Sequence, residues 1–225
     1  MTPALRIPAY PIVNLVLTQV AWLACVLGGA RGTSLPGLGA VAVVVAIHLA
    51  ASARPGPEAA RLALAAALGF AIDAALGFAG VCTWVGGAAG GRLPPPWLVA
   101  LWPSFATLLA ASLSWLTLRW WLAGLFGLVG GPLAYFAGSK FAALGFPSGD
   151  AIGLAAVGVA WALAMIVLAR VARPAPDPPA GSAQIRTPAH RATTLRPTPP
   201  AQGRAQKAGR PETVTRPKAR RVYIC

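Results

Sequence analysis

Six apolar stretches separated by short polar breaks are the feature that most constrains this 225-residue chain. Each stretch is close to the roughly 20 residues that an α-helix needs to cross about 30 Å of hydrocarbon. The second stretch is the shortest. We therefore expect an all-α membrane protein with about six transmembrane helices, at Tyr10–Ala30, Leu35–Ala51, Leu62–Trp84, Trp97–Leu118, Trp120–Gly138 and Ala151–Ala169.

Residues that break helices or favour membrane interfaces lie between these stretches. Arg31-Gly32 separates the first pair, Arg54-Pro55-Gly56-Pro57 the second, and Phe146-Pro147-Ser148-Gly149-Asp150 precedes the sixth stretch. Indole rings prefer the headgroup level of a bilayer, and four tryptophans stand at span ends. They are Trp84, Trp97, Trp120 and Trp121.

Charge divides the chain into two parts. Apolar residues make up 56% of the sequence and charged residues 11%, against about a quarter charged in ordinary globular proteins. Most lysines and arginines lie from Arg170 onward, among prolines and with little to bury. We therefore expect a transmembrane domain at residues 1–173 and a disordered, basic, Pro-rich cytoplasmic tail at residues 174–225. Such a tail should contact anionic lipid weakly, and it lacks the features of a dedicated nucleic-acid domain.

The lysines and arginines also predict an orientation, because positive charge is retained on the cytoplasmic side. One side of a six-span topology holds Arg6, Arg54, Arg61, Arg119, Arg170 and Arg173, and the other holds Arg31, Arg92 and Lys140. Both termini should therefore be cytoplasmic. The first stretch is longer than the 7–15 apolar residues of a signal peptide, so we expect it to be retained.

Motifs for metal binding and catalysis are missing from the sequence. Cys25, Cys82 and Cys225 show no CxxC spacing, and no Ser-His-Asp grouping, HExxH motif or phosphate loop is present. We expect no metal site, no cofactor and no enzymatic activity.

Asp73 is the acid inside a predicted span, about twelve residues beyond Arg61 and so near the membrane midplane. An intramembrane carboxylate costs about 2.5–3.5 kcal/mol on insertion scales and usually faces the interior of a helix bundle. Gly69 and Gly77 lie four residues to either side, so a neighbouring helix can approach closely. Asp73 is either a proton or cation site or a hydrogen-bonded residue that fixes helix packing.

Depth along the helices suggests partners for this acid. Gln19 and Thr107 should lie at a depth similar to that of Asp73, and a second layer nearer the cytoplasm could gather Asn14, His48 and Ser112. Such side chains in membranes bond across helices more often than they bind substrate. His48, without another His or Cys nearby in the sequence, is a weak metal candidate and favours a helix–helix hydrogen bond.

The fifth stretch contains Gly127-x-x-x-Gly131 followed by Pro132. Glycines at this spacing favour a close helix crossing. Pro132 removes a backbone donor and should kink the helix near its centre. Broken helices also line substrate sites in transporters, which is the alternative interpretation.

The sequence resembles a family of small, multispanning bacterial inner-membrane proteins known as a domain of unknown function. The resemblance covers about residues 14–169 and implies a location in the bacterial inner membrane without implying a substrate. The family often has Asn-His where this chain has Ala110-Ala111, which argues against a polar role there. The matching residues are Asn14-Leu15, Gln19, Trp22, Cys25-Val26-Leu27-Gly28, Ile72-Asp73, Leu101-Trp102, Phe105-Ala106-Thr107, Ser112-Leu113-Ser114-Trp115-Leu116, Gly130-Gly131-Pro132-Leu133-Ala134-Tyr135 and Ala137-Gly138.

Two functions fit these features. One is small-solute or ion- or proton-coupled transport, which would need a cavity that reaches Asp73. The other is a structural or partner-binding membrane subunit, which would be dry and packed throughout. The sequence specifies neither a substrate nor an oligomeric state.

Overall fold

The computed structural model describes residues 9–172, and this part of the chain is almost entirely helical. Two short strands, β1 (Thr83–Trp84) in the loop after α3 and β2 (Leu144–Gly145) in the loop after α6, form an antiparallel pair. The predicted domain boundary after Arg173 and the predicted disordered tail lie outside the described residues. The helices are α1 (Tyr10–Ala30), α2 (Leu35–Ala51), α3 (Pro55–Phe78), α4 (Ala88–Gly91), α5 (Pro96–Ala110), the 3₁₀ helix η1 (Ser114–Leu118), α6 (Trp120–Lys140) and α7 (Asp150–Val171).

Four predicted spans match the observed helices closely, and two do not. The third helix begins at Pro55 rather than Leu62 and ends at Phe78, because prolines and an acid favour the first turn of a helix. The fourth ends at Ala110 instead of Leu118. There the amide of Leu113 bonds the carbonyl of Leu108 at 2.6 Å, and Ser112 Oγ donates to the carbonyl of Pro11 at 2.5 Å. These bonds close the helix and turn the chain into η1.

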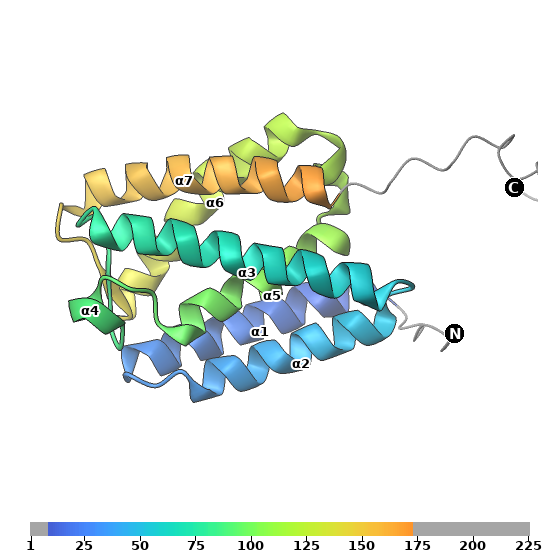
Figure 1. The fold of residues 1–225 in the computed structure, drawn as a ribbon, viewed down its shortest axis with the longest axis horizontal. Coiled ribbons are helices and arrows are strands. Elements are labelled where there is room, and N and C mark those ends of the chain that lie inside the picture. Colours follow the sequence, from blue (N-terminus) through green and yellow to red (C-terminus); the bar gives the residue numbers. More distant parts are fainter. Residues whose placement is uncertain (1–8, 173–225) are drawn as a thin grey trace, which may run out of the picture. The chain divides into compact units, whose positions relative to one another are not determined.

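The six main helices run alternately back and forth along the bundle (Figure 1). The first residue of α1 and the last of α7 therefore lie at the same end. Four helices, α1, α3, α6 and α7, are long and apolar enough to cross a membrane. The shorter α2 and α5 have 17 and 15 residues, or about 25 Å and 22 Å at 1.5 Å per residue. The predicted all-helical fold is confirmed.

Glycines bring the helices close together at several crossings. A Cβ added to Gly127 would lie 2.4 Å from the carbonyl oxygen of Trp161, and one added to Gly131 would lie 2.4 Å from the Trp161 ring. Helices α6 and α7 therefore pack closely along this stripe, backbone to backbone at Gly127 and backbone to ring at Gly131, as small residues in membrane helices allow. Helix α6 continues through Pro132 without interruption.

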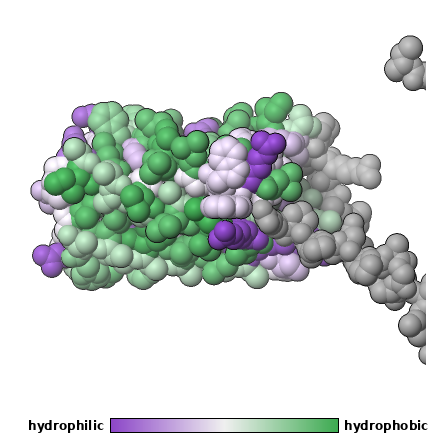
Figure 2. All heavy atoms as spheres, turned by 90° about the horizontal axis from the view of Figure 1, so that it is seen from above, coloured by the Kyte–Doolittle hydropathy of each residue, from purple (hydrophilic) through white to green (hydrophobic). Residues whose placement is uncertain are grey.

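Apolar side chains cover much of the outer surface of the bundle. Figure 2 shows one face that is mostly hydrophobic, with hydrophilic residues toward its ends. Exposed aliphatic residues occur along whole helices, for example Val16, Val129 and Val159. A soluble monomer rarely exposes so much contiguous apolar surface. Together with the four long apolar helices, this surface is that of a membrane-spanning protein.

Two of the four tryptophans predicted at the interface lie in the core instead. Trp84 and Trp97 are buried, whereas Trp120 and Trp121 are exposed as expected. Trp97 is held against Gly29 of α1, where an added Cβ would fall 2.4 Å from the ring. Its position just inside α5 placed it at a span end in the sequence, but the absence of a side chain at Gly29 lets it pack inward.

Candidate functional site

Asp73 lies on the buried stripe of α3 and is completely inaccessible to solvent. The indole Nε1–H of Trp102 on α5 donates to Asp73 Oδ2 at 2.9 Å, and the hydroxyl of Tyr135 on α6 donates to Oδ1. A Cβ on Gly69, one turn earlier, would lie 2.0 Å from the Trp102 ring. Gly69 therefore lets Trp102 approach the helix that carries Asp73. Gly77, one turn later, lets the backbone carbonyl of Arg92 approach the same helix. A Cβ added to Gly77 would lie 1.9 Å from that carbonyl oxygen.

The structure places Asp73 five residues, or about 7.5 Å, from the C-terminal end of α3, because this helix spans Pro55–Phe78. Its donor Trp102 is the seventh of the 15 residues of α5. The predicted partners of Asp73 are different. Gln19 is exposed on α1, and Thr107 lies more than one helical turn beyond Trp102 on α5. Depth along a helix does not determine which side chains face one another, and two aromatic donors occupy the positions assigned to these polar residues.

Thr107 belongs to a second polar cluster, with Asn14 and Ser112. Asn14 Nδ2 donates to Thr107 Oγ1 at 2.9 Å, and Ser112 Oγ donates to Asn14 Oδ1 at 3.2 Å. Thr107 Oγ1 itself donates to the carbonyl of Ser104 at 2.7 Å. Asn14 and Thr107 are buried, so these bonds join α1 to α5 and to the turn that follows it.

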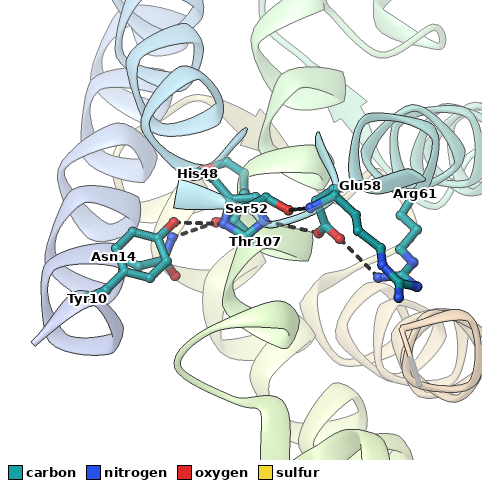
Figure 3. Close-up of polar contacts among 9 residues, drawn as sticks. Tyr10, Asn14, His48, Ser52, Glu58, Arg61 and Thr107 are labelled. Atoms are coloured by element: carbon teal, nitrogen blue, oxygen red, sulfur yellow. Dashed lines mark hydrogen bonds and ion pairs between the residues drawn. The ribbon is translucent and has the colours of Figure 1, made fainter. Parts of the chain in front are cut away.

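A third cluster is a chain of polar side chains from α1 through α2 to α3. His48 Nδ1 lies 2.7 Å from the Tyr10 hydroxyl, and His48 Nε2 lies 3.0 Å from Glu58 Oε1. Arg61 completes the chain with an ion pair to Glu58 Oε2 at 3.0 Å. Figure 3 shows His48 between Tyr10 and Glu58, with Asn14 and Thr107 on the same side of the bundle. His48 therefore forms helix–helix hydrogen bonds rather than joining Asp73.

Several residues of these clusters were not predicted as site residues, among them Glu58, Trp102 and Tyr135. Glu58 was overlooked because the third span was predicted to start at Leu62, although Pro55 and Pro57 with a nearby acid are a typical helix start. Trp102 and Tyr135 were treated as parts of a matching pattern only. Aromatic N–H and O–H groups in mid-span positions need acceptors when they are buried, and this rule could have pointed to Asp73.

Among residues 9–172, no group of three or more His, Cys, Asp or Glu side chains is arranged to hold a metal ion. His48 and Glu58 form a pair with Arg61, which brings a positive charge to the carboxylate. This arrangement suits an ion pair and not a cation site.

A cavity of about 510 Å³ lies between α1, α5, α6 and α7. Its volume is within the range of small-molecule sites. On α6 its wall is formed largely by small residues, including Gly130, Gly131 and Ala134, so missing side chains create the space. Trp102 and Tyr135, the two donors to Asp73, also line it, whereas Asp73 does not. The acid therefore stands behind the wall of the cavity and holds two of its residues in place.

Gln19 lies on the same cavity, at the tenth of the 21 residues of α1. Neighbouring Thr18 and Trp22 line it as well. The structure thus divides the predicted polar site in three: Asp73 behind the cavity wall, Gln19 on the cavity, and Asn14, Thr107 and His48 in the separate polar clusters. Gly131 lines the cavity, while Gly127 packs against α7.

Comparison with known proteins gives a family and no characterised relative. Residues 11–167 match a family described as "Protein of unknown function (DUF2878)". No curated protein and no solved structure matches the chain. The matched residues span α1 to α7 and include most of the three polar clusters and the cavity-lining residues. This membrane-spanning chain belongs to the DUF2878 family of proteins of unknown function.

Proposed function

We propose that this protein binds a small, mostly apolar solute in the cavity between α1, α5, α6 and α7 and moves it across or within the membrane. The observation that carries this proposal is that Trp102 and Tyr135 line the cavity while both donate to the buried Asp73. A rigid wall of this kind is what a pre-formed ligand site requires. Asp73 is then a positioning residue that acts through the two aromatic side chains.

The chemistry of the cavity favours an apolar solute over an ion. Its lining residues carry no ionisable side chain apart from Tyr135, whose hydroxyl is already engaged. A desolvated cation would lack a counter-charge on the cavity surface, because both oxygens of Asp73 are occupied by donors. Ion or proton coupling through Asp73 would require Tyr135 or Trp102 to move away first. We propose no catalytic role.

We further propose that the protein lies in the bacterial inner membrane with both termini in the cytoplasm. Within the described residues, Arg54, Arg119 and Arg170 lie at helix ends, and Arg61 lies in the second turn of α3, on the side where α1 begins and α7 ends. Arg31, Arg92 and Lys140 lie at the opposite helix ends. The asymmetry continues in the sequence with Arg6, Arg173 and the basic tail. Labelling of cysteines introduced after Arg173 by a membrane-impermeant reagent tests it, and reaction in intact cells would contradict this orientation.

Binding of a neutral lipophilic dye tests the cavity directly. N-phenyl-1-naphthylamine should bind the purified protein in detergent, and Gly130→Leu should abolish that binding by filling the cavity. A Cβ at Gly130 meets only the Phe126 ring, at 3.6 Å, so the substitution fits. Gly39→Leu on α2 is the matched control, since a Cβ there meets nothing within 4 Å and Gly39 is outside the cavity.

Cells then separate transport from a structural role. Expression of the wild-type protein should change the accumulation rate of the dye, whereas the Gly130→Leu variant should not. If the protein binds the dye but does not change its accumulation, transport is contradicted and the protein only binds its solute. Equal dye binding by the wild type and Gly130→Leu would contradict a solute site in this cavity. It would favour the competing proposal of a structural or partner-binding subunit.

A further inference from the structure

A buried hydroxyl without a hydrogen-bond partner lies on the wall of the cavity. Among residues 9–172, five buried side-chain polar atoms have no hydrogen-bond partner. Three of them, Thr18 Oγ1, Trp97 Nε1 and Trp161 Nε1, belong to residues that line the cavity. The Trp97 N–H lies against Gly29 of α1 and the Trp161 N–H lies near the Tyr135 hydroxyl, so Thr18 is the one of these three that is left for a ligand.

Leaving such groups unsatisfied is energetically costly. A buried donor without an acceptor costs about 1–3 kcal/mol, and most buried polar atoms in proteins are paired. Thr18 is more than nine-tenths buried, so solvent does not relieve it. Gln19 adds a second donor, an amide, on the same cavity, in the middle of α1. These groups together call for a ligand that supplies acceptors.

The rest of the wall defines the body of that ligand. The indole rings of Trp102 and Trp161 stack with centroids 4.6 Å apart, and Phe105 meets Trp161 edge-on at 5.3 Å. These three residues all line the cavity and form a rigid aromatic surface. Aromatic surfaces of this kind pack well against flat rings. No lysine, arginine, aspartate or glutamate lines the cavity, so a neutral ligand is favoured over a charged one.

The cavity reaches the lipid-facing surface between α1 and α6. Helix α1 packs mainly on α2 and α5, and α6 packs on α7. Leu15 of α1 and Phe126 of α6 both line the cavity, and they are 41% and 38% exposed. A ligand can therefore enter sideways from the bilayer. A phospholipid chain is a poorer match, because its acceptor groups stay at the headgroup level whereas Thr18 and Gln19 lie in the middle of α1.

We infer that the cavity binds a neutral lipophilic carbonyl compound of the quinone type, whose flat ring packs on the aromatic wall and whose carbonyl oxygens accept hydrogen bonds from Thr18 and Gln19. This inference rests on the proposed solute site and names the class of solute. Binding alone is inferred, without any redox step.

A matched pair of probes tests this inference in the full-length protein. The two probes are 2-decyl-1,4-naphthoquinone and 2-decylnaphthalene, which share a ring and a chain and differ in the carbonyl oxygens. The purified protein is heated with each probe, and size-exclusion chromatography measures the fraction that remains folded. This readout avoids optical interference from the quinone. Half-maximal protection should need about tenfold less quinone than hydrocarbon, or about threefold for each of the two hydrogen bonds.

Two variants show whether the donors cause this preference. Thr18→Val keeps the shape of the side chain and removes a hydroxyl that has no partner among the described residues, so folding should be unaffected. Gln19→Leu removes the exposed amide. Each should reduce the quinone preference several-fold and leave binding of the hydrocarbon unchanged, while Gly130→Leu should abolish binding of both probes.

The possible results are distinct. Equal binding of both probes, or a quinone preference that survives in Thr18→Val and Gln19→Leu together, overturns this inference and leaves the apolar-solute site standing. Failure of both probes and of the dye overturns the inference and the proposed function together. A phospholipid or a second protein chain that copurifies in the cavity and is not displaced by the quinone also overturns it.

Discussion

Tyr135 of α6 donates a hydrogen bond to Asp73 of α3, and so joins two helices that have few other contacts with each other. The bond lies directly behind the wall of the cavity, because Tyr135 lines that wall. Trp102 of α5 fixes the other oxygen of the same carboxyl group. One acid therefore links three helices around the cavity, and its energetic role can be measured by substitution.

The Asp73–Tyr135 pair should show strong energetic coupling. Tyr135→Phe should destabilise the protein by about 1–3 kcal/mol, because it leaves one oxygen of a buried acid without its donor. Asp73→Ala removes both acceptor oxygens, so Tyr135→Phe should cost much less in a protein that already carries Asp73→Ala. A double-mutant cycle by unfolding in detergent should yield a coupling of about 0.5–3 kcal/mol. Additive effects would show that the bond contributes nothing.

Asp73→Asn separates a packing role from a proton-carrying role. The change nearly conserves volume, and the Tyr135 hydroxyl can turn to accept from the new amide while Trp102 still donates to its oxygen. A residue that only positions these two side chains should therefore retain most dye binding and accumulation. Dye accumulation that disappears while dye binding and stability in detergent hold would instead assign a proton to Asp73. The measurement is accumulation in cells and binding by the purified variant, compared at equal expression.

The glycines of α6 should differ in their response to alanine. Gly127→Ala and Gly131→Ala should each destabilise the protein by about 1–3 kcal/mol, because their new Cβ atoms would collide with Trp161. Gly130→Ala is the matched control on the same helix, since its Cβ has ordinary contact with Phe126 only. It should be neutral or stabilising by up to about 1 kcal/mol, given the helix propensity of alanine. Melting in detergent measures all three, and equal effects would contradict the close α6–α7 crossing.

Glu58 should matter more for stability than its partner Arg61. The Glu58 side chain is 9% exposed and bonds both His48 and Arg61, whereas the Arg61 side chain is 38% exposed. Glu58→Ala should cost about 3 kcal/mol, the usual effect of breaking a buried pair, and Arg61→Ala at most about 1 kcal/mol. Unfolding in detergent at neutral pH compares them. A larger effect of Arg61→Ala would show that the chain to His48 is unimportant.

Cys82, in the loop after α3, should be unreactive in the folded protein. Burial raises the pKa of its thiol from 9.0 to about 12, and the nearby Asp73 adds to the shift. The thiolate required for alkylation is therefore scarce at about pH 8. In a Cys225→Ser background, a maleimide should label the protein only after unfolding, since Cys25 is buried as well. Rapid labelling of folded protein would contradict the burial of this loop.

The same shift gives a pH dependence of stability. Because the folded thiol holds its proton to a higher pH than the unfolded one, its contribution is complete below about pH 9 and is lost as pH rises toward 12. Stability in detergent should therefore fall over this range less steeply for Cys82→Ala than for the parent. The difference between the two curves isolates Cys82 from other groups that titrate at high pH.

The sequence was most informative wherever the membrane itself dictates the structure. The bounds of α1 and α2 follow from the length of the apolar runs and the turn residues between them, since hydrocarbon requires long apolar helices. The burial of Asp73 follows from the cost of a carboxyl group in lipid. The close crossings at Gly69 and Gly131 follow from the absence of side chains there.

The tertiary structure alone decided which side chains meet. Gln19 and Thr107 matched Asp73 in estimated depth, yet Trp102 and Tyr135 reach it, because helix rotation and neighbour choice depend on packing across all helices at once. The cavity depends on the same choice, since small residues on α6 create space only where α1 and α6 fail to close on each other. The sequence shows which polar side chains must be shielded from lipid. Only the packed bundle determines which of them form hydrogen bonds with one another and which remain free to bind a ligand.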